Sequence, residues 1–295
     1  MSSAVKPSAK IFGSAGMCLL GTAVLMLPPA VSADAAPSSG PIVIRGIPTT
    51  TTAPASNELR LAYLANFSQG SLDAALDKLG AGALQFGAFE VPGSNPTIEP
   101  RPGEILVSDY RPVGLDPDVI PASGVWATQL NFGPGTVSRY RATFIAPTGP
   151  LPGGGFAVGV NAKTGDKNDV FTDTRIAATV NVRPGFLVRF GVPFGSTEPA
   201  RVVLPDDVKT AMFSSTDPQP FTIELTVNRT NGEGTAKLLV IDQVFTVPFT
   251  LSDFLKDSGP AISAVGPGIA VNSNAPGQTA SVRVREFRIF ANVGG

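Results

Sequence analysis

The chain has 295 residues, with 22 Lys+Arg against 23 Asp+Glu and a formal net charge of −1, so bulk charge does not favour nucleic acid or an anionic membrane as a partner. It contains no histidine, which excludes Ser-His-Asp and Cys-His catalysis and histidine-ligated zinc. Charged residues make up only 15%, while 32 glycines and 28 prolines favour short strands joined by tight turns over helices.

Residues 1–35 are predicted to be a secretory signal peptide. Two lysines precede an apolar run over residues 11–27, a proline pair ends the run, and small residues then place cleavage after Ala33 or Ala35. An uncleaved membrane anchor is the alternative, but the run is marginal in length for a span and is interrupted by glycines. The only cysteine, Cys18, lies within the run, so the mature chain is expected to contain no disulfide.

The segment after the signal contains a linker and then a helical pattern. Residues 36–57 are rich in proline, serine and threonine and are expected to form a flexible linker. Residues 58–82 hold the only convincing helical pattern of the chain. Ser71 can cap the segment Leu72–Leu79 and Gly80 can end it, which predicts a short helical segment that packs on the main domain.

From about residue 83 the apolar residues recur every second position, as in half-buried strands. Such runs cover residues 84–88, 126–132, 140–144, 156–160, 186–190, 221–227 and 239–249. Turn-forming residues separate the runs, and Asn231-Gly232-Glu233-Gly234 predicts a hairpin. This spacing indicates an all-β antiparallel sandwich or barrel over residues 83–295.

The last alternating run, Ser281–Phe290, places arginine and apolar residues in turn and then slips in phase by one residue. A β-bulge near Arg285 and Glu286 would produce such a slip. The arginine row formed by Arg283, Arg285 and Arg288 is expected to be a solvated strand face, with an acidic polysaccharide as the alternative ligand.

Three segments resemble the concanavalin A-like lectin/glucanase superfamily of jelly-roll domains. They are the hairpin segment Pro220–Asp242, the closing strand Val282–Ile289, and Glu104–Tyr110, which is expected to pair with the closing strand. The resemblance covers roughly residues 83–292 and implies an antiparallel two-sheet jelly-roll sandwich and, more loosely, a carbohydrate ligand. The Glu-x-Asp-x-x-Glu strand of the glucanase members does not occur here, which removes the catalytic residues of that branch.

One loop clusters the hard oxygen donors that Ca²⁺ prefers. Asp166, Asn168, Asp169 and Asp173 are the candidate ligands, and calcium is the only cofactor considered. Their spacing does not match an EF-hand, and two nearby lysines reduce the negative charge. An ordinary polar loop between strands is therefore the alternative interpretation.

Sugar sites commonly combine an aromatic platform with a few polar groups, and the candidate ligand-binding residues are Tyr110, Trp126 and Glu224. Trp126 alternates with apolar residues, which favours a place in the core. Glu224 faces opposite to the apolar set of its strand, where a solvent-facing position is the ordinary interpretation. No catalytic residue is assigned, although Glu224 and Asp242 could form a two-carboxylate pair.

We therefore expect a secreted, non-catalytic binding module of lectin-like type, with an extracellular glycan or cell-surface component as its partner. Nucleic acid is not expected as a partner, and neither is a membrane beyond the export signal. Two alternatives stay open. One is an extracellular structural or protein-interaction domain without a small ligand, and the other is a carboxylate-based glycosidase or lyase.

Overall fold

The computed structural model describes residues 59–65, 67, 75–77, 85–90, 93–164, 175–192, 201–252, 254–259 and 261–292. The chain divides into two compact units, residues 1–50 and 51–295, and all described residues belong to the second. The predicted signal peptide and linker lie outside the described residues. Within the described part, no helix is long and apolar enough to span a membrane.

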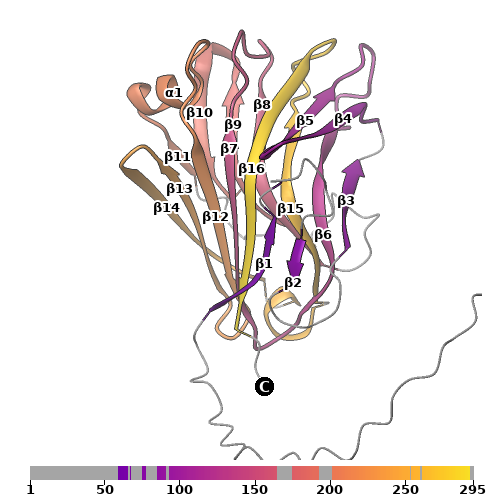
Figure 1. Cartoon of the computed structure of the whole chain (residues 1–295), viewed down its shortest axis with the longest axis vertical. Coiled ribbons are helices and arrows are strands. Elements are labelled where there is room, and N and C mark those ends of the chain that lie inside the picture. Colours follow the sequence, from indigo (N-terminus) through magenta and orange to yellow (C-terminus); the bar gives the residue numbers. More distant parts are fainter. Residues whose placement is uncertain are drawn as a thin grey trace, which may run out of the picture. The chain divides into compact units, whose positions relative to one another are not determined.

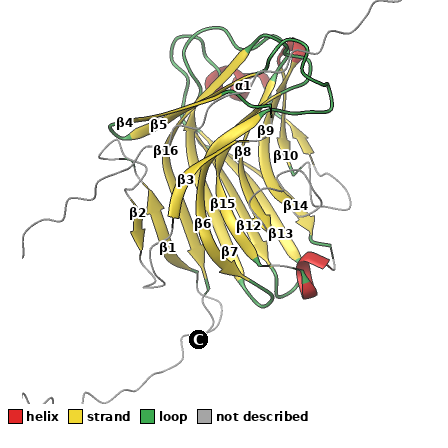
Figure 2. Cartoon of the chain, turned by 90° about the vertical axis from the view of Figure 1, so that its right-hand side faces the viewer, coloured by secondary structure: helices red, strands yellow, loops and turns green. Residues whose placement is uncertain are grey.

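Two antiparallel sheets form the second unit, and Figures 1 and 2 show them as layers. The nine-stranded sheet, here called sheet A, contains β1 (Arg60–Ala65), β2 (Ala75–Asp77), β4 (Pro96–Arg101), β5 (Glu104–Tyr110), β7 (Val137–Ile145), β12 (Phe221–Asn228), β13 (Glu233–Val240), β14 (Gln243–Thr250) and β16 (Thr279–Ala291). The seven-stranded sheet, sheet B, contains β3 (Gln85–Glu90), β6 (Ala122–Phe132), β8 (Phe156–Thr164), β9 (Arg175–Arg183), β10 (Leu187–Gly191), β11 (Arg201–Val203) and β15 (Ile262–Val271). Short helical turns connect strands at η1 (Pro184–Phe186), α1 (Asp206–Met212) and η2 (Phe254–Ser258). The expected all-β, two-sheet architecture is thus confirmed.

The strand order brings distant parts of the sequence together. Sheet A runs β14-β13-β12-β7-β16-β1-β2, and β5 also pairs with β16. Sheet B runs β11-β10-β9-β8-β15-β6-β3. The last strand therefore lies between the first strand and the middle of sheet A, and its expected pairing with Glu104–Tyr110 is confirmed.

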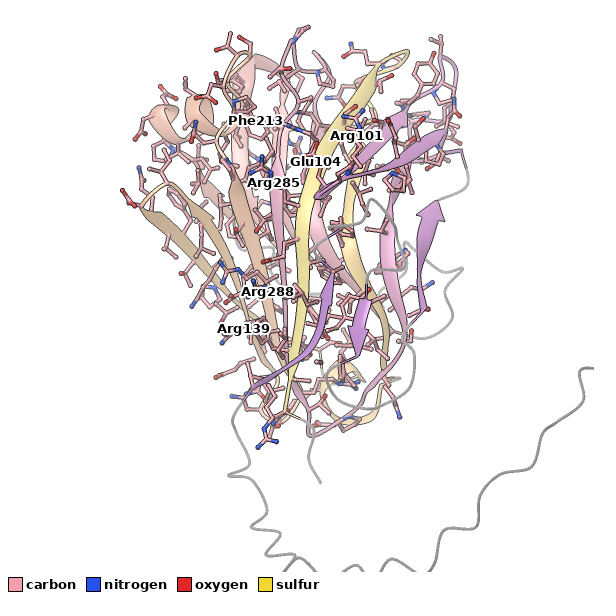
Figure 3. All side chains as sticks on the ribbon, viewed as in Figure 1. Arg101, Glu104, Arg139, Phe213, Arg285 and Arg288 are labelled. Carbon is pink, nitrogen blue, oxygen red and sulfur yellow. The ribbon has the colours of Figure 1, made fainter. Side chains whose placement is uncertain are left out.

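The core fills the space between the sheets, because the period-two alternation turns every second side chain of each strand inward. Phe144 of β7 stacks on Phe221 of β12, with ring centroids 5.6 Å apart. Phe213, which follows α1, contacts Phe221 of sheet A at 6.0 Å and the edge of Phe156 of sheet B at 5.9 Å. Phe213, labelled in Figure 3, thus joins the two sheets beside the short helix.

Two turn predictions from the sequence are confirmed. The register between β16 and β7 shifts between Val284 and Glu286, which leaves Arg285 as the extra residue of a bulge. The β12–β13 hairpin turns at residues 229–232. There the Oδ1 of Asn228 accepts hydrogen bonds from the backbone N–H groups of Thr230 and Asn231. Gly232 adopts a φ of 77° there, which glycine accepts without strain.

Two apolar residues that were expected to face inward lie in turns instead. Phe186 belongs to the 3-10 turn between β9 and β10, has a φ of 58° and is 37% exposed. Ile241 begins the two-residue turn between β13 and β14, with a φ of 51° and 62% exposure. The inward residues of β13 include Ala236, Leu238 and Val240. Ile241 is exposed because the central residues of a tight hairpin lie outside the alternation.

The helix predicted over Leu72–Leu79 is wrong in its described part. Ala75–Asp77 is strand β2, which pairs with β1, and β1 pairs in turn with β16. Sheet A therefore begins before residue 83. The edge of β1 offers backbone hydrogen bonds to this segment, and tertiary pairing of this kind overrides a helix propensity worth only a fraction of a kcal/mol per residue, about 0.5.

Candidate functional site

The three ligand-binding residues predicted from the sequence do not form one site. Trp126 lies in sheet B, whereas Tyr110 and Glu224 lie in sheet A. Across sheet A, Tyr110 pairs with Thr279 of β16, while the row that contains Glu224 reaches β16 at Arg288. That offset of about nine strand residues corresponds to about 30 Å, so even the two residues of sheet A cannot hold the same small ligand.

Trp126 is buried at 6% exposure, but not between the sheets. Its neighbours Val125 and Ala127 belong to the shared core, so the alternation turns the indole to the opposite face of sheet B. A buried indole offers no open platform for a sugar ring, and Trp126 is therefore not a candidate for stacking.

Glu224 lies on the outer face of sheet A and is surrounded by cations. Its Oε1 is 3.5 Å from Nε of Arg139, and its direct cross-strand partners are Arg141 and Lys237. Asp242, in the following turn, lies five residues beyond Lys237, which corresponds to about 16 Å along the strand. Paired glycosidase carboxylates stand about 5–9.5 Å apart, so Glu224 and Asp242 do not form such a pair.

The four predicted calcium ligands, Asp166, Asn168, Asp169 and Asp173, lie outside the described residues. Among the residues that the structure does describe, no group of three or more acidic, cysteine or histidine side chains could hold a metal ion.

The outer face of sheet A carries arginines, among them Arg139, Arg285 and Arg288 (Figure 3). The ion pairs are Arg139–Glu224 at 3.5 Å, Arg283–Glu104 at 3.8 Å, Arg285–Glu104 at 3.9 Å and Arg288–Glu286 at 2.7 Å. The arginine row seen in the sequence is therefore compensated by its own neighbours. Partly exposed pairs of this kind contribute about 0–1 kcal/mol each.

The outer face of sheet B has a different character, because one row across it consists largely of glycines. Cross-strand partners on six neighbouring strands form a row across this face. From β6 to β11 its residues are Gly124, Gly268, Gly159, Thr179, Gly191 and Arg201. A Cβ added at Gly159 would lie 2.5 Å from the carbonyl oxygen of Ala178. Glycine at this position thus lets β8 and β9 approach closely.

A shallow hollow lies at the end of this row, over β9, β10 and β11. Its lining residues are Thr179, Asn181, Arg183, Arg189, Phe190, Gly191 and Arg201. We call it the arginine hollow. Arg189 stands directly beside Asn181, and its diagonal neighbours across the two adjoining strands are Arg183 and Arg201.

The arginines of the hollow are not compensated as those of sheet A are. Within the described part of the chain, none of Arg183, Arg189 and Arg201 forms an ion pair. Diagonal cross-strand neighbours have Cα atoms about 7 Å apart, so the like charges of their side chains repel one another. The hollow therefore concentrates positive charge at a cost to stability.

Asn181 adds a polar group that its neighbours do not satisfy. Its Oδ1 is buried and has no hydrogen-bond partner among the described residues. An unsatisfied buried polar atom of this kind is rare in folded proteins and costs about 1–3 kcal/mol. The amide lies beside Arg189, and its residue lines the hollow.

Sequence reasoning missed the hollow. The alternation of β10 assigns Val188 and Phe190 to the core and therefore turns Arg189 outward. The sequence around Arg189 does not show that Arg183 and Arg201 stand beside it. That information is contained in the register between β9, β10 and β11.

No family model matches the chain, and no curated protein matches it. Solved structures to which it is similar include lectin I-B4 from Griffonia simplicifolia in its metal-free form, with 14% identity over 70% of this chain and 93% of that chain and a TM-score of 0.44. A lectin from Bauhinia forficata in complex with GalNAc is 14% identical over 72% of this chain and 100% of that chain, with a TM-score of 0.45. The CBM2 module of the evolved Dit of Lactobacillus casei BL23 phage J-1 is 12% identical over 80% of this chain and 97% of that chain, with a TM-score of 0.48. These structures include legume lectins, which have the jelly-roll fold that the sequence resembles; at this identity they assign no ligand or site residue to this chain.

Proposed function

We propose that the protein is a lectin-like binding module that holds a sugar in the arginine hollow without cleaving it. The observation that supports this proposal is the set of three guanidinium groups around one hollow, none of them in an ion pair within the described residues. Guanidinium, amide and hydroxyl groups together supply the donors and acceptors that a ligand rich in hydroxyl groups requires.

A binding role fits the hollow better than a catalytic one. Its lining contains arginine, asparagine, threonine, phenylalanine and glycine. General acid–base catalysis requires a group that gains and loses a proton near the working pH, whereas arginine stays protonated. Glu224, the carboxylate considered from the sequence, lies on sheet A among cations.

The proposal includes export. The signal predicted over residues 1–35 would deliver the domain to an extracellular glycan or cell-surface component. N-terminal sequencing of the protein recovered from the outside of expressing cells tests this directly. A mature chain that begins at Asp34 or Ala36 supports export, and a chain retained with its first 35 residues contradicts it.

A glycan-array screen of the purified protein tests the binding function. We expect saturable binding to one class of glycan, loss of that binding in the Arg189→Ala variant and retention in Arg285→Ala, which removes a paired arginine from sheet A. Repeating the screen in EDTA tests the proposed calcium ligands at residues 166–173. A blank array from folded wild-type protein would overturn the proposal in favour of an extracellular structural or protein-interaction domain.

A further inference from the structure

The charge of the arginine hollow identifies the kind of group that fills it. The chain has a net charge of −1, yet three arginines from three neighbouring strands surround this one hollow. A neutral sugar would leave their mutual repulsion in place. An anion placed between them would replace that repulsion by attraction, which makes a negative charge the better complement.

Guanidinium geometry narrows the choice of anion. The planar fork of arginine donates two parallel hydrogen bonds to the oxygens of a carboxylate, a sulfate or a phosphate. Arg189 lies diagonally between Arg183 and Arg201, so an oxyanion above it can contact more than one of them. The neighbouring Asn181 amide and Thr179 hydroxyl remain for the hydroxyl groups of the ring that carries the anion.

Sheet A provides the internal contrast. Its arginines Arg285 and Arg288 each have a glutamate within 4 Å, at 3.9 Å and 2.7 Å, whereas no described residue that lines the hollow is a carboxylate. The arginines of β16 are thus neutralised by glutamates of the protein, whereas those of the hollow form no ion pair within the described residues.

We infer that the sugar bound in the arginine hollow is acidic, and that its carboxylate or sulfate ester is held by Arg189 with Arg183 and Arg201 on either side. The inference rests on the proposed function and adds the substrate class to it. Uronate carboxylates and sulfate esters share this chemistry, and the test separates them.

The test is a set of calorimetric titrations of the whole protein with tetragalacturonate, with its fully methyl-esterified form and with a sulfated oligosaccharide of the same length. The ester keeps the sugar and removes the charge. We expect at least one of the two acidic ligands to bind at least tenfold more tightly than the ester, and the tighter one identifies the anion. Raising the salt from 50 to 500 mM should weaken that binding by about tenfold.

The variants tie the anion to the hollow. Arg189→Gln should lower the affinity for the acidic ligand at least tenfold, because glutamine keeps hydrogen-bonding groups and loses the charge. Arg285→Gln, the matched control on sheet A, should change it less than twofold. If the thermal unfolding curve shows that Arg189→Gln does not fold, Arg201→Gln replaces it in the titration. Arg201 is exposed, so its substitution should not disturb the fold.

The outcomes separate the inference from the function beneath it. If the methyl ester binds as tightly as the acidic ligands, the inference is overturned while the sugar-binding function stands. If Arg285→Gln weakens acidic binding as much as Arg189→Gln does, the assignment to the hollow is overturned. If no sugar of any charge binds, both the inference and the proposed function fail.

Discussion

The outer faces of the two sheets use arginine in opposite ways. On sheet A, β16 and its neighbours pair Arg283, Arg285 and Arg288 with glutamates, which gives a solvated surface with a structural role (Figure 3). On sheet B, Arg183 and Arg189 share a hollow with a third arginine and form no ion pair within the described residues. Uncompensated charge in a hollow is a better indicator of a site than arginine content alone.

Charge reversal in the hollow should have the largest effect. Arg189→Glu is expected to weaken binding of an acidic oligosaccharide at least 100-fold, about 2.7 kcal/mol, because it replaces an attraction by a repulsion. Arg285→Glu, the same change on sheet A, should leave the affinity within about twofold. Isothermal titration calorimetry of both variants measures the difference. Equal losses in the two would remove the distinction between the sheets.

The central glycine of the row across sheet B should be a requirement of strand packing. Gly159→Ala is expected to destabilise the fold by about 2 kcal/mol, since its Cβ would stand 2.5 Å from the carbonyl oxygen of Ala178. Gly133→Ala is the control, because no atom outside the adjoining residues lies within 4 Å of a Cβ there. Urea unfolding reports both changes. A stable Gly159→Ala variant would show that strand packing does not require this glycine.

Removing the countercharge of sheet A should have a smaller effect on stability. Glu224→Gln leaves Arg139 and the cross-strand cations Arg141 and Lys237 without their shared carboxylate. We expect the free energy of unfolding to fall by about 1 kcal/mol, with affinity for sugar unchanged. Thermal unfolding together with a binding titration checks this. A loss of affinity at unchanged stability would place Glu224 in the binding site.

The smallest effect is expected at the bulge. Arg285 is 52% exposed and 3.9 Å from Glu104, so Arg285→Ala should change the free energy of unfolding by less than about 0.5 kcal/mol. Urea unfolding at low and high salt measures it. A change above 1 kcal/mol would mean that the arginines of sheet A contribute more to stability than their exposed pairs indicate.

Local patterns in the sequence predicted much of the fold. The phase slip after Val284 predicted the bulge at Arg285, and the glycines at 232 and 234 predicted the hairpin, because each feature depends on residues close together in the chain. The helix over Leu72–Leu79 failed where a strand edge from elsewhere in the chain competed with local propensity.

The candidate site could not be predicted in the same way. Alternation turns Arg189 out of the core, but it does not show that a hollow lies beside it, and it favoured the core for Trp126, which the structure places on the outer face of sheet B. The hollow exists because the register of three strands brings Arg183 and Arg201 to either side of Arg189. Tyr110 and Glu224 were selected on residue type and local pattern, and the long-range register separates them.

A crystal structure of the protein soaked with the tightest acidic oligosaccharide tests the central claim most directly. The account predicts the carboxylate or sulfate of the sugar within hydrogen-bonding distance of Arg189, with Arg183 or Arg201 as a second contact. A sugar bound instead along Arg285 and Arg288 of sheet A, or anywhere away from the arginine hollow, would contradict it.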